Sequence, residues 1–322
     1  MLRKLLEPLL IFSLLNCFHD LSAQVIDNTV SFRSVHQKSY FRFHYDNDYF
    51  TKADHYYSQG ITLEYVHPGL KHNPLSKLLI RSQDNYNRYG VSFDLFGYTP
   101  TNVRSDSILP GDRPFAAAMT IRSFVCGIDS IHRKRISSAI VIGVIGPLGQ
   151  GYEIHAGIHR WLNNPLPHGW ENQIHNDVVL DYQLSYEKQL FADPGHFSLN
   201  AVSELRLGTL NDKINGGFNF MAGNFSEPFQ KRNSKKVEYY FYGQARANFI
   251  AYDASMQGGM FNKNSPYTIA AGDISRLTFQ ADAGIIVNFK KIYLSYTQSF
   301  LSKEFRSGKY HRWGGVSLGF SL

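Results

Sequence analysis

Long stretches of this sequence alternate apolar and polar residues with a period of two. In residues 41–46, for example, aromatic rings alternate with Arg42, His44 and Asp46. This is the pattern of a β-strand that has one apolar and one polar face. Several runs reach ten or more residues, which is longer than a usual strand of a soluble protein. The pattern therefore predicts an all-β chain with unusually long strands.

The polar faces of these runs favour a transmembrane barrel over a soluble sandwich. They carry charged residues in mid-run, at Glu64, Asp94, Asp181, Glu204, Arg206, Arg246 and Asp282. An outer-membrane barrel combines an apolar outside, a polar lumen and tilted strands of about 9–11 residues. A soluble sandwich produces the same alternation and stays open as the alternative.

The alternating runs number twelve, an even count such as a bacterial single-chain barrel requires. They are residues 39–47, 57–66, 87–97, 114–126, 135–147, 178–190, 197–208, 213–222, 237–251, 274–288, 291–300 and 311–322. The run at 213–222 is the weakest, because glycines interrupt it, whereas 311–322 alternates up to the last residue, as a closing strand would. We predict a twelve-stranded antiparallel transmembrane β-barrel.

One segment breaks the strand period. Between Pro147 and Asn176, apolar residues at 154, 158, 161 and 162 recur at helical spacing, and prolines at 165 and 167 end the run. We expect a short helix in the loop after the fifth strand, with its apolar side against the barrel. His155 and His159 lie four residues apart and therefore share one face of this helix.

The N-terminus reads as a secretory signal at residues 1–23, followed by the barrel domain at 24–322. Arg3 and Lys4 precede a short apolar run, and a small-residue cleavage site ends at Ala23. A retained anchor and a lipoprotein box ending at Cys17 are the alternatives. Cleavage would remove Cys17 and leave Cys126 as the single cysteine.

The formal net charge of +7 favours partners with anionic surfaces. A secretory signal makes nucleic acid an improbable partner and leaves phospholipid or phosphorylated glycolipid. We expect a membrane-embedded protein of the bacterial outer membrane that works as a monomer.

Strand direction alone brings six polar clusters to one rim of the predicted barrel, because odd strands end where even strands begin. The clusters are Asn47 with Asp48, Ser58, Arg104, residues 111–114, His155 with His159, and residues 169–173. A passive pore has no need for such convergence, although porin loops are polar as well. The rim is therefore the predicted functional site.

These clusters resemble the lipid A 3′-O-deacylase family. The resemblance rests on the runs YDND at 45–48, YYSQG at 56–60, GDRPF at 111–115, GVIGP at 143–147 and GWENQ at 169–173, together with His159. Their order and spacing match across residues 47–176. The resemblance implies a twelve-stranded outer-membrane barrel that hydrolyses the 3′ acyloxyacyl group of lipid A with Ca²⁺. It also implies a site between the barrel wall and the loop helix.

Individual roles follow from the same resemblance. His159 falls on the general base, Asn47 and Asp48 on the acidic pair near the calcium, and Ser58 on a hydroxyl that is Thr in some members. Two positions depart from the family pattern. The family's lysine falls at or next to Val103, so that Arg104 replaces it by a shift of one, and His155 stands where the family often has Gln.

The residue types suit this chemistry. A histidine of near-neutral pKa can take a proton from water. A hard cation held by Asp48 and carbonyl oxygens can stabilise an oxyanion. Arg104 or Arg113 can grip a substrate phosphate.

Structural interpretations stand beside these functional ones. His159 would pack at the helix–barrel seam, Asn47 and Asp48 would form a turn, and Arg113 would form an ion pair at the rim. Trp170 reads as an interfacial anchor rather than a substrate contact.

Other functions remain as alternatives. His155 and His159 could be a zinc pair, although a third ligand is not evident. The G-x-S-x-G pattern at 315–319 lacks the following helix that a nucleophile elbow needs. A passive pore or receptor barrel, and a soluble or lipoprotein-type glycan-binding module, are the rival classes.

Overall fold

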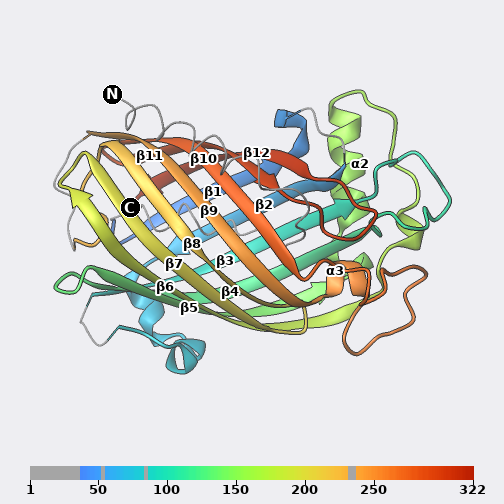
Figure 1. Cartoon of the computed structure of the whole chain (residues 1–322), viewed down its shortest axis with the longest axis horizontal. Coiled ribbons are helices and arrows are strands. Elements are labelled where there is room, and N and C mark those ends of the chain that lie inside the picture. The colour runs from blue at the N-terminus through green and yellow to red at the C-terminus, as the bar shows by residue number, and fades with distance from the viewer. Residues whose placement is uncertain (1–36, 52–54, 83–85, 231–236) are drawn as a thin grey trace, which may run out of the picture.

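A computed structural model describes residues 37–51, 55–82, 86–230 and 237–322 of the chain. They form one closed barrel in which each strand pairs antiparallel with its neighbours in sequence, and β1 pairs with β12 to complete the ring (Figure 1). The predicted twelve-stranded barrel is confirmed. The predicted signal segment at 1–23 lies outside the described residues.

The strands are β1 (Tyr40–Asn47), β2 (Tyr56–Val66), β3 (Asn87–Thr99), β4 (Ala116–Asp129), β5 (Lys134–Ile145), β6 (Asp177–Asp193), β7 (Phe197–Gly208), β8 (Asn211–Asn224), β9 (Val237–Asp253), β10 (Leu277–Phe289), β11 (Ile292–Leu301) and β12 (His311–Ser321).

The expected strand boundaries differ from the observed ones mainly at the loop-bearing rim. The weakest predicted strand is present as β8, where Gly217 allows close packing: an added Cβ would lie 2.0 Å from the Ala245 carbonyl oxygen. Residues 114–115, predicted to open the fourth strand, precede it, and the Phe115 ring packs against Trp170. Residues 274–276 likewise precede β10.

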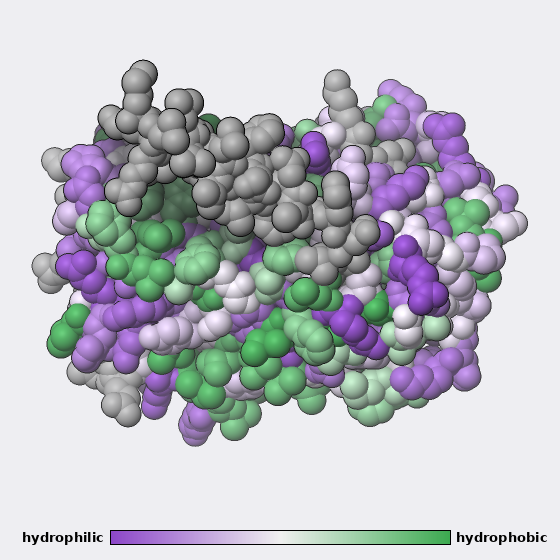
Figure 2. All heavy atoms as spheres, in the orientation of Figure 1, coloured by the Kyte–Doolittle hydropathy of each residue, from purple (hydrophilic) through white to green (hydrophobic). Residues whose placement is uncertain are grey.

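The outer wall is apolar. Ile121, Leu180 and Ile285 are 58%, 54% and 60% exposed and project from the strands. Figure 2 shows hydrophobic side chains over the strands of the visible face and mostly hydrophilic ones over the loops at its right-hand end. This is the surface that hydrocarbon chains of a bilayer require.

The interior is polar and filled. The pairs Arg42–Glu64 (2.8 Å) and Arg135–Glu187 (2.6 Å) cross between neighbouring strands, and all four side chains are at most 5% exposed. Arg206 also pairs with Glu204, which lies two residues earlier on the same strand β7. A buried charge is tolerated when it is paired, and the mid-run charges Glu64, Glu204 and Arg206 are held in such interior ion pairs. Side chains, rather than an open water column, occupy this part of the lumen.

The helical segments lie at the two ends of the barrel. The 3₁₀ turns η3 (Pro68–His72) and η4 (Pro74–Leu78) connect β2 to β3 at one end. At the other end, on the right of Figure 1, the loops carry η2 (Asp48–Thr51), η5 (Pro147–Gly149), α2 (Gly151–Trp161), η6 (Trp170–Asn172) and α3 (Ala254–Gln257). α2 is the helix predicted between Pro147 and Asn176. None of the helices in the described part of the chain has the length and apolar character to cross a membrane.

We predict that the mature chain migrates differently on detergent gels before and after boiling. Closure of β1 on β12 leaves no free strand edge from which the barrel can unzip. The measurement is electrophoresis of paired unboiled and boiled samples. Identical migration, together with solubility without detergent, would contradict the membrane barrel.

Candidate active site

Asn47 ends β1 on the outer side of the barrel wall, and Asp48 follows it. Phe41 and Phe43, which share the parity of Asn47 in β1, are exposed outward. The Asn47 Nδ2 donates to the Ser58 carbonyl oxygen at 2.7 Å, and its Oδ1 accepts from the Tyr49 amide at 2.7 Å. Asp48, which is 8% exposed, then begins η2. The pair is a strand end and a turn start, held against β2 by the amide of Asn47.

A β-bulge in β2 brings Ser58 and Gln59 to the same outer face. The register of β2 against β3 shifts between Tyr57 and Gln59. The Tyr57 hydroxyl lies inside, 3.3 Å from Asp46 Oδ2, and regular alternation resumes after the bulge. The Ser58 Oγ is 2.6 Å from Thr99 Oγ1 on β3. The extra residue therefore places a hydroxyl and an amide side by side beneath the rim.

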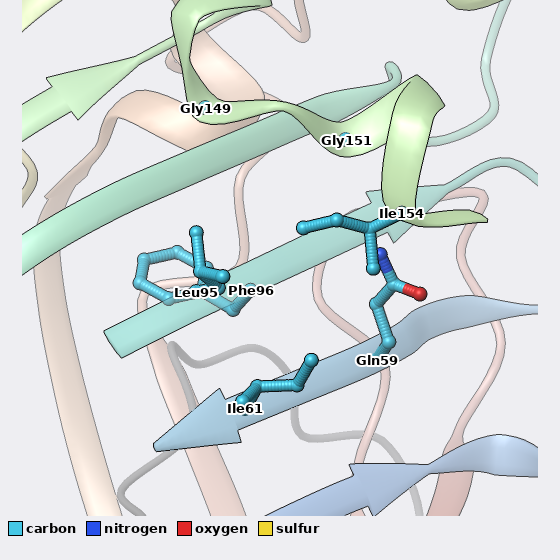
Figure 3. A pocket seen from close by; sticks show the side chains of 7 residues that line it. All are labelled: Gln59, Ile61, Leu95, Phe96, Gly149, Gly151 and Ile154. Atoms are coloured by element: carbon cyan, nitrogen blue, oxygen red, sulfur yellow. The ribbon is translucent and has the colours of Figure 1, made fainter. Parts of the chain in front are cut away.

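A narrow hollow separates this part of the wall from α2. Figure 3 shows its lining, in which Ile61 and Leu95 of the wall face Ile154 of the helix and the Gln59 side chain extends toward Ile154. Phe96, Gly149 and Gly151 complete the lining. Gln59 is 3% exposed, and its Oε1 has no hydrogen-bond partner among the described residues. A buried amide oxygen without a partner is costly, which marks it as an acceptor available to a ligand. Sequence reasoning missed Gln59, although it lies within the YYSQG run.

Gly151 allows α2 to approach the wall closely. A Cβ at this position would lie 2.3 Å from the Trp170 ring and 2.5 Å from the Ala117 Cβ. Any larger residue would therefore force the first turn of the helix away from the wall. The same turn leads to His155 on the buried side of the helix.

His159 has a defined tautomer. Its Nδ1 lies within hydrogen-bond distance of the Pro165 carbonyl oxygen. A carbonyl oxygen only accepts, so Nδ1 must carry the hydrogen and Nε2 of the neutral ring must carry the lone pair. His159 is half-buried and lies in the last turn of α2. Its Nε2 is therefore equipped to accept a proton.

His155 lies deeper. Its ring packs edge-on against His159, with 4.5 Å between centroids, and its Nδ1 accepts from the Trp170 indole Nε1 at 3.2 Å. Burial, and to a lesser extent the neighbouring His159, lower the pKa of His155 to about 3. His155 is therefore neutral at physiological pH and is a much weaker base than an ordinary histidine.

Trp170 is part of the seam between the helix and the barrel, and the expectation of an interfacial anchor is wrong. It is 3% exposed and packs with Phe115 and Ala117. The ring sits beneath α2 because Gly151 leaves room for it. It faces protein on all sides rather than a lipid headgroup.

The two candidate phosphate-binding arginines differ in access. Arg104 is exposed on the loop between β3 and β4, next to the buried Val103. Arg113 is 1% exposed, pairs with Glu304, and lies 3.9 Å from the centre of the Tyr98 ring. The observed surroundings of Arg113 favour the structural ion pair over the grip on a substrate phosphate.

Within the described ranges, no three His, Cys, Asp or Glu side chains gather into a metal-binding cluster. The two histidines use their Nδ1 atoms toward Trp170 and Pro165. Oxygen atoms near the rim come instead from the backbone, from the unpartnered Gln59 amide and from the buried Asp48 carboxylate at the start of η2. Oxygen donors of this kind suit a hard cation such as Ca²⁺.

The fold and the site define an outer-membrane β-barrel enzyme whose candidate site lies on the outer wall, under a loop helix. The family model described as outer membrane protein LpxR matches residues 9–322. The chain therefore belongs to the LpxR outer membrane protein family, the lipid A 3′-O-deacylases, which are hydrolases. A search of curated protein sequences returned no match.

Among solved structures, LpxR from Salmonella typhimurium superposes with a TM-score of 0.72 at 18% identity, over 88% of this chain and 100% of that one. An outer membrane channel from Pseudomonas putida F1 gives a TM-score of 0.46 at 9% identity, covering 95% of this chain and 99% of the channel. The translocator domain of the autotransporter NalP from Neisseria meningitidis gives 0.46 at 10% identity, covering 91% and 92%. The first of these likenesses supports the barrel fold, and membership of an outer membrane protein family places the barrel in the outer membrane.

We predict that Gly151→Ala lowers lipid A deacylation about 10²-fold, because displacement of a catalytic group by about 1 Å can cost that much. Gly157→Ala on the same helix is the matched control. An added Cβ there meets no described atom within 4 Å, and alanine favours the helix by about 1 kcal/mol. Activity is read from the mass of the lipid product, and the gel shift checks that the barrel has closed. Equal activity of the two variants would contradict close docking of α2.

Proposed function

We propose that this protein removes the 3′ acyloxyacyl group of lipid A in a calcium-dependent hydrolysis in which His159 is the general base. The hydrogen bond from His159 Nδ1 to the Pro165 carbonyl carries the proposal. This bond leaves the lone pair of Nε2 free to accept a proton, on a helix that packs beside the hollow in the outer wall. A base at this position can activate water for attack on an ester of a lipid that lies in the outer leaflet.

In this reaction one proton is transferred twice, first to His159 and then to the leaving group. His159 Nε2 takes one proton from a water molecule while the water oxygen attacks the acyl carbonyl. The resulting tetrahedral intermediate expels the sugar oxygen, which receives the same proton back from the imidazolium. The Pro165 carbonyl, already bonded to Nδ1–H, stabilises the charged ring between these two steps. The products are the free acyloxyacyl acid and the 3′ hydroxyl of the lipid.

His155 supports this reaction without titrating. Its burial keeps the ring neutral, and the bond from Trp170 occupies Nδ1. The ring proton therefore lies on Nε2, where it is a hydrogen-bond donor. Such a donor can hold a substrate or water oxygen much as a side-chain amide can.

The oxygen atoms near the rim fit a calcium ion. Asp48 would supply a buried carboxylate, and Gln59 an amide oxygen that no described group satisfies. Asn47, whose own Oδ1 already accepts from Tyr49, would position the strand end rather than complete the ligand set. When bound, Ca²⁺ would supply positive charge for the developing oxyanion.

The remaining parts of the proposal concern the substrate and the assembly. Ser58 lies on the same outer face as Gln59, and the exposed Arg104 is free to reach a lipid phosphate. The barrel closes on itself, so one chain presents the whole candidate site. We therefore propose a monomer that acts on a lipid diffusing along its wall.

The passive pore is the second candidate, and the filled interior weighs against it. Arg42, Glu64, Arg135 and Glu187 are enclosed as ion pairs inside the barrel. A conducting pore keeps its lumen charges hydrated. The polar convergence on the outer wall also has no use in conduction.

We predict that His159→Gln reduces deacylation by about 10²–10⁴-fold, the usual contribution of a general base. His155→Gln should retain most of the activity, because an amide still donates a hydrogen bond, whereas His155→Leu should lose it. Lipid mass spectrometry of the three folded variants, with calcium and zinc varied separately, measures this. Loss of activity in both Gln variants, with activity that follows zinc rather than calcium, would establish the zinc pair instead.

We predict that Asp48→Asn abolishes the calcium response while the barrel still forms. The substitution preserves the shape of the side chain but removes the charge that holds a hard cation. Asp106→Asn is the control, because Asp106 lies at the same rim with a side chain that is 78% exposed. The readout is deacylation against calcium concentration, with excess chelator as the zero point. Full activity in chelator would overturn the calcium requirement.

A further inference from the structure

The two histidines of α2 are held in opposite tautomers by a single loop. The Pro165 carbonyl only accepts, so His159 carries its ring hydrogen on Nδ1. The Trp170 indole only donates, so His155 carries its hydrogen on Nε2. Both partners belong to the segment between α2 and β6. The two rings together offer one N–H donor and one lone pair on their Nε2 atoms.

Trp170 is fixed well enough to impose this choice. Its ring lies 4.9 Å from the Phe115 ring, centroid to centroid, and belongs to a buried cluster with Phe115 and Ala117. The backbone before it is equally constrained. Gly169 has a φ of +83°, and a Cβ there would lie 2.6 Å from the Ser105 carbonyl oxygen. The indole N–H is therefore presented to His155 by a rigid support.

We propose that Trp170 is a positioning residue for the deacylase reaction, which acts by holding His155 in the Nε2–H tautomer. Without the indole donor, His155 Nδ1 would be a buried acceptor with no partner. The ring would then populate the other tautomer, in which Nε2 is an acceptor. The site would present two lone pairs, and no donor would face the substrate oxygen. This inference rests on the proposed catalytic role of the α2 histidines.

The kinetic test is a double-mutant cycle between Trp170 and His155. Trp170→Phe keeps an aromatic ring in the seam and removes the N–H donor together with part of the ring volume, and the cycle separates these two losses because only the first acts through His155. We expect kcat to fall about fivefold, the equivalent of one ordinary hydrogen bond, with KM little changed. In a His155→Gln background the same substitution should leave kcat unchanged, because an amide has no ring tautomer to select. Trp161→Phe is the matched control, since Trp161 is 82% exposed at the end of the same helix.

The spectroscopic test is independent of activity. In protein labelled with ¹⁵N-histidine, the His155 signals are identified by their absence in His155→Gln. We expect Nε2 to resonate as a protonated ring nitrogen and Nδ1 as an unprotonated one. The signals should move toward mixed tautomers in Trp170→Phe. The gel shift of each variant confirms that the barrel has closed.

Two results would overturn the proposal. One is a predominantly Nδ1–H His155 in the unsubstituted protein. The other is an equal kinetic cost of Trp170→Phe in both backgrounds, which would mean that Trp170 only packs the seam. If neither the unsubstituted protein nor any variant deacylates lipid A, the proposed function is wrong. The tautomer measurement would still decide the role of Trp170 toward His155.

Discussion

The barrel depends on one requirement, that every backbone amide within the bilayer finds a partner inside the protein. The pairing of β1 with β12, from Tyr40 opposite Ser321 to Asn47 opposite Gly314, meets this requirement by removing the last free edge. Closure also decides which side each residue faces. In β1 the even positions turn into a lumen of paired charges, and the odd positions turn toward lipid.

The candidate site follows from that constraint and from two local features, the bulge in β2 and the glycine at the start of α2. The odd parity of β1 delivers Asn47 to the outer wall, and the bulge in β2 adds Ser58 beside Gln59 where strict alternation would allow one of them. α2 then covers the place, and its close approach depends on Gly151. A candidate site on a lipid-facing wall is suited to a substrate that stays in the membrane while one ester is hydrolysed.

Alternation predicted the barrel, helical spacing predicted the loop helix, and strand direction predicted the rim that gathers the polar clusters, because these depend on local periodicity and chain order. The bulge at Ser58 and the unpartnered amide of Gln59 could not be predicted, because they depend on the register of β2 against β3. An ion pair of Arg113 at the rim was one of the sequence-based interpretations, but its partner Glu304 and the burial of Trp170 escaped prediction. Both arise from contacts between loops that are distant in sequence.

The most direct test of the central claim is mass spectrometry of lipid A after lipopolysaccharide has been incubated with the purified barrel and calcium. We predict a lipid that has lost one acyloxyacyl unit from its 3′ position, and release of the corresponding acid. Chelated samples should show neither product. Unchanged lipid A, with a barrel whose closure the gel shift has verified, would contradict the account.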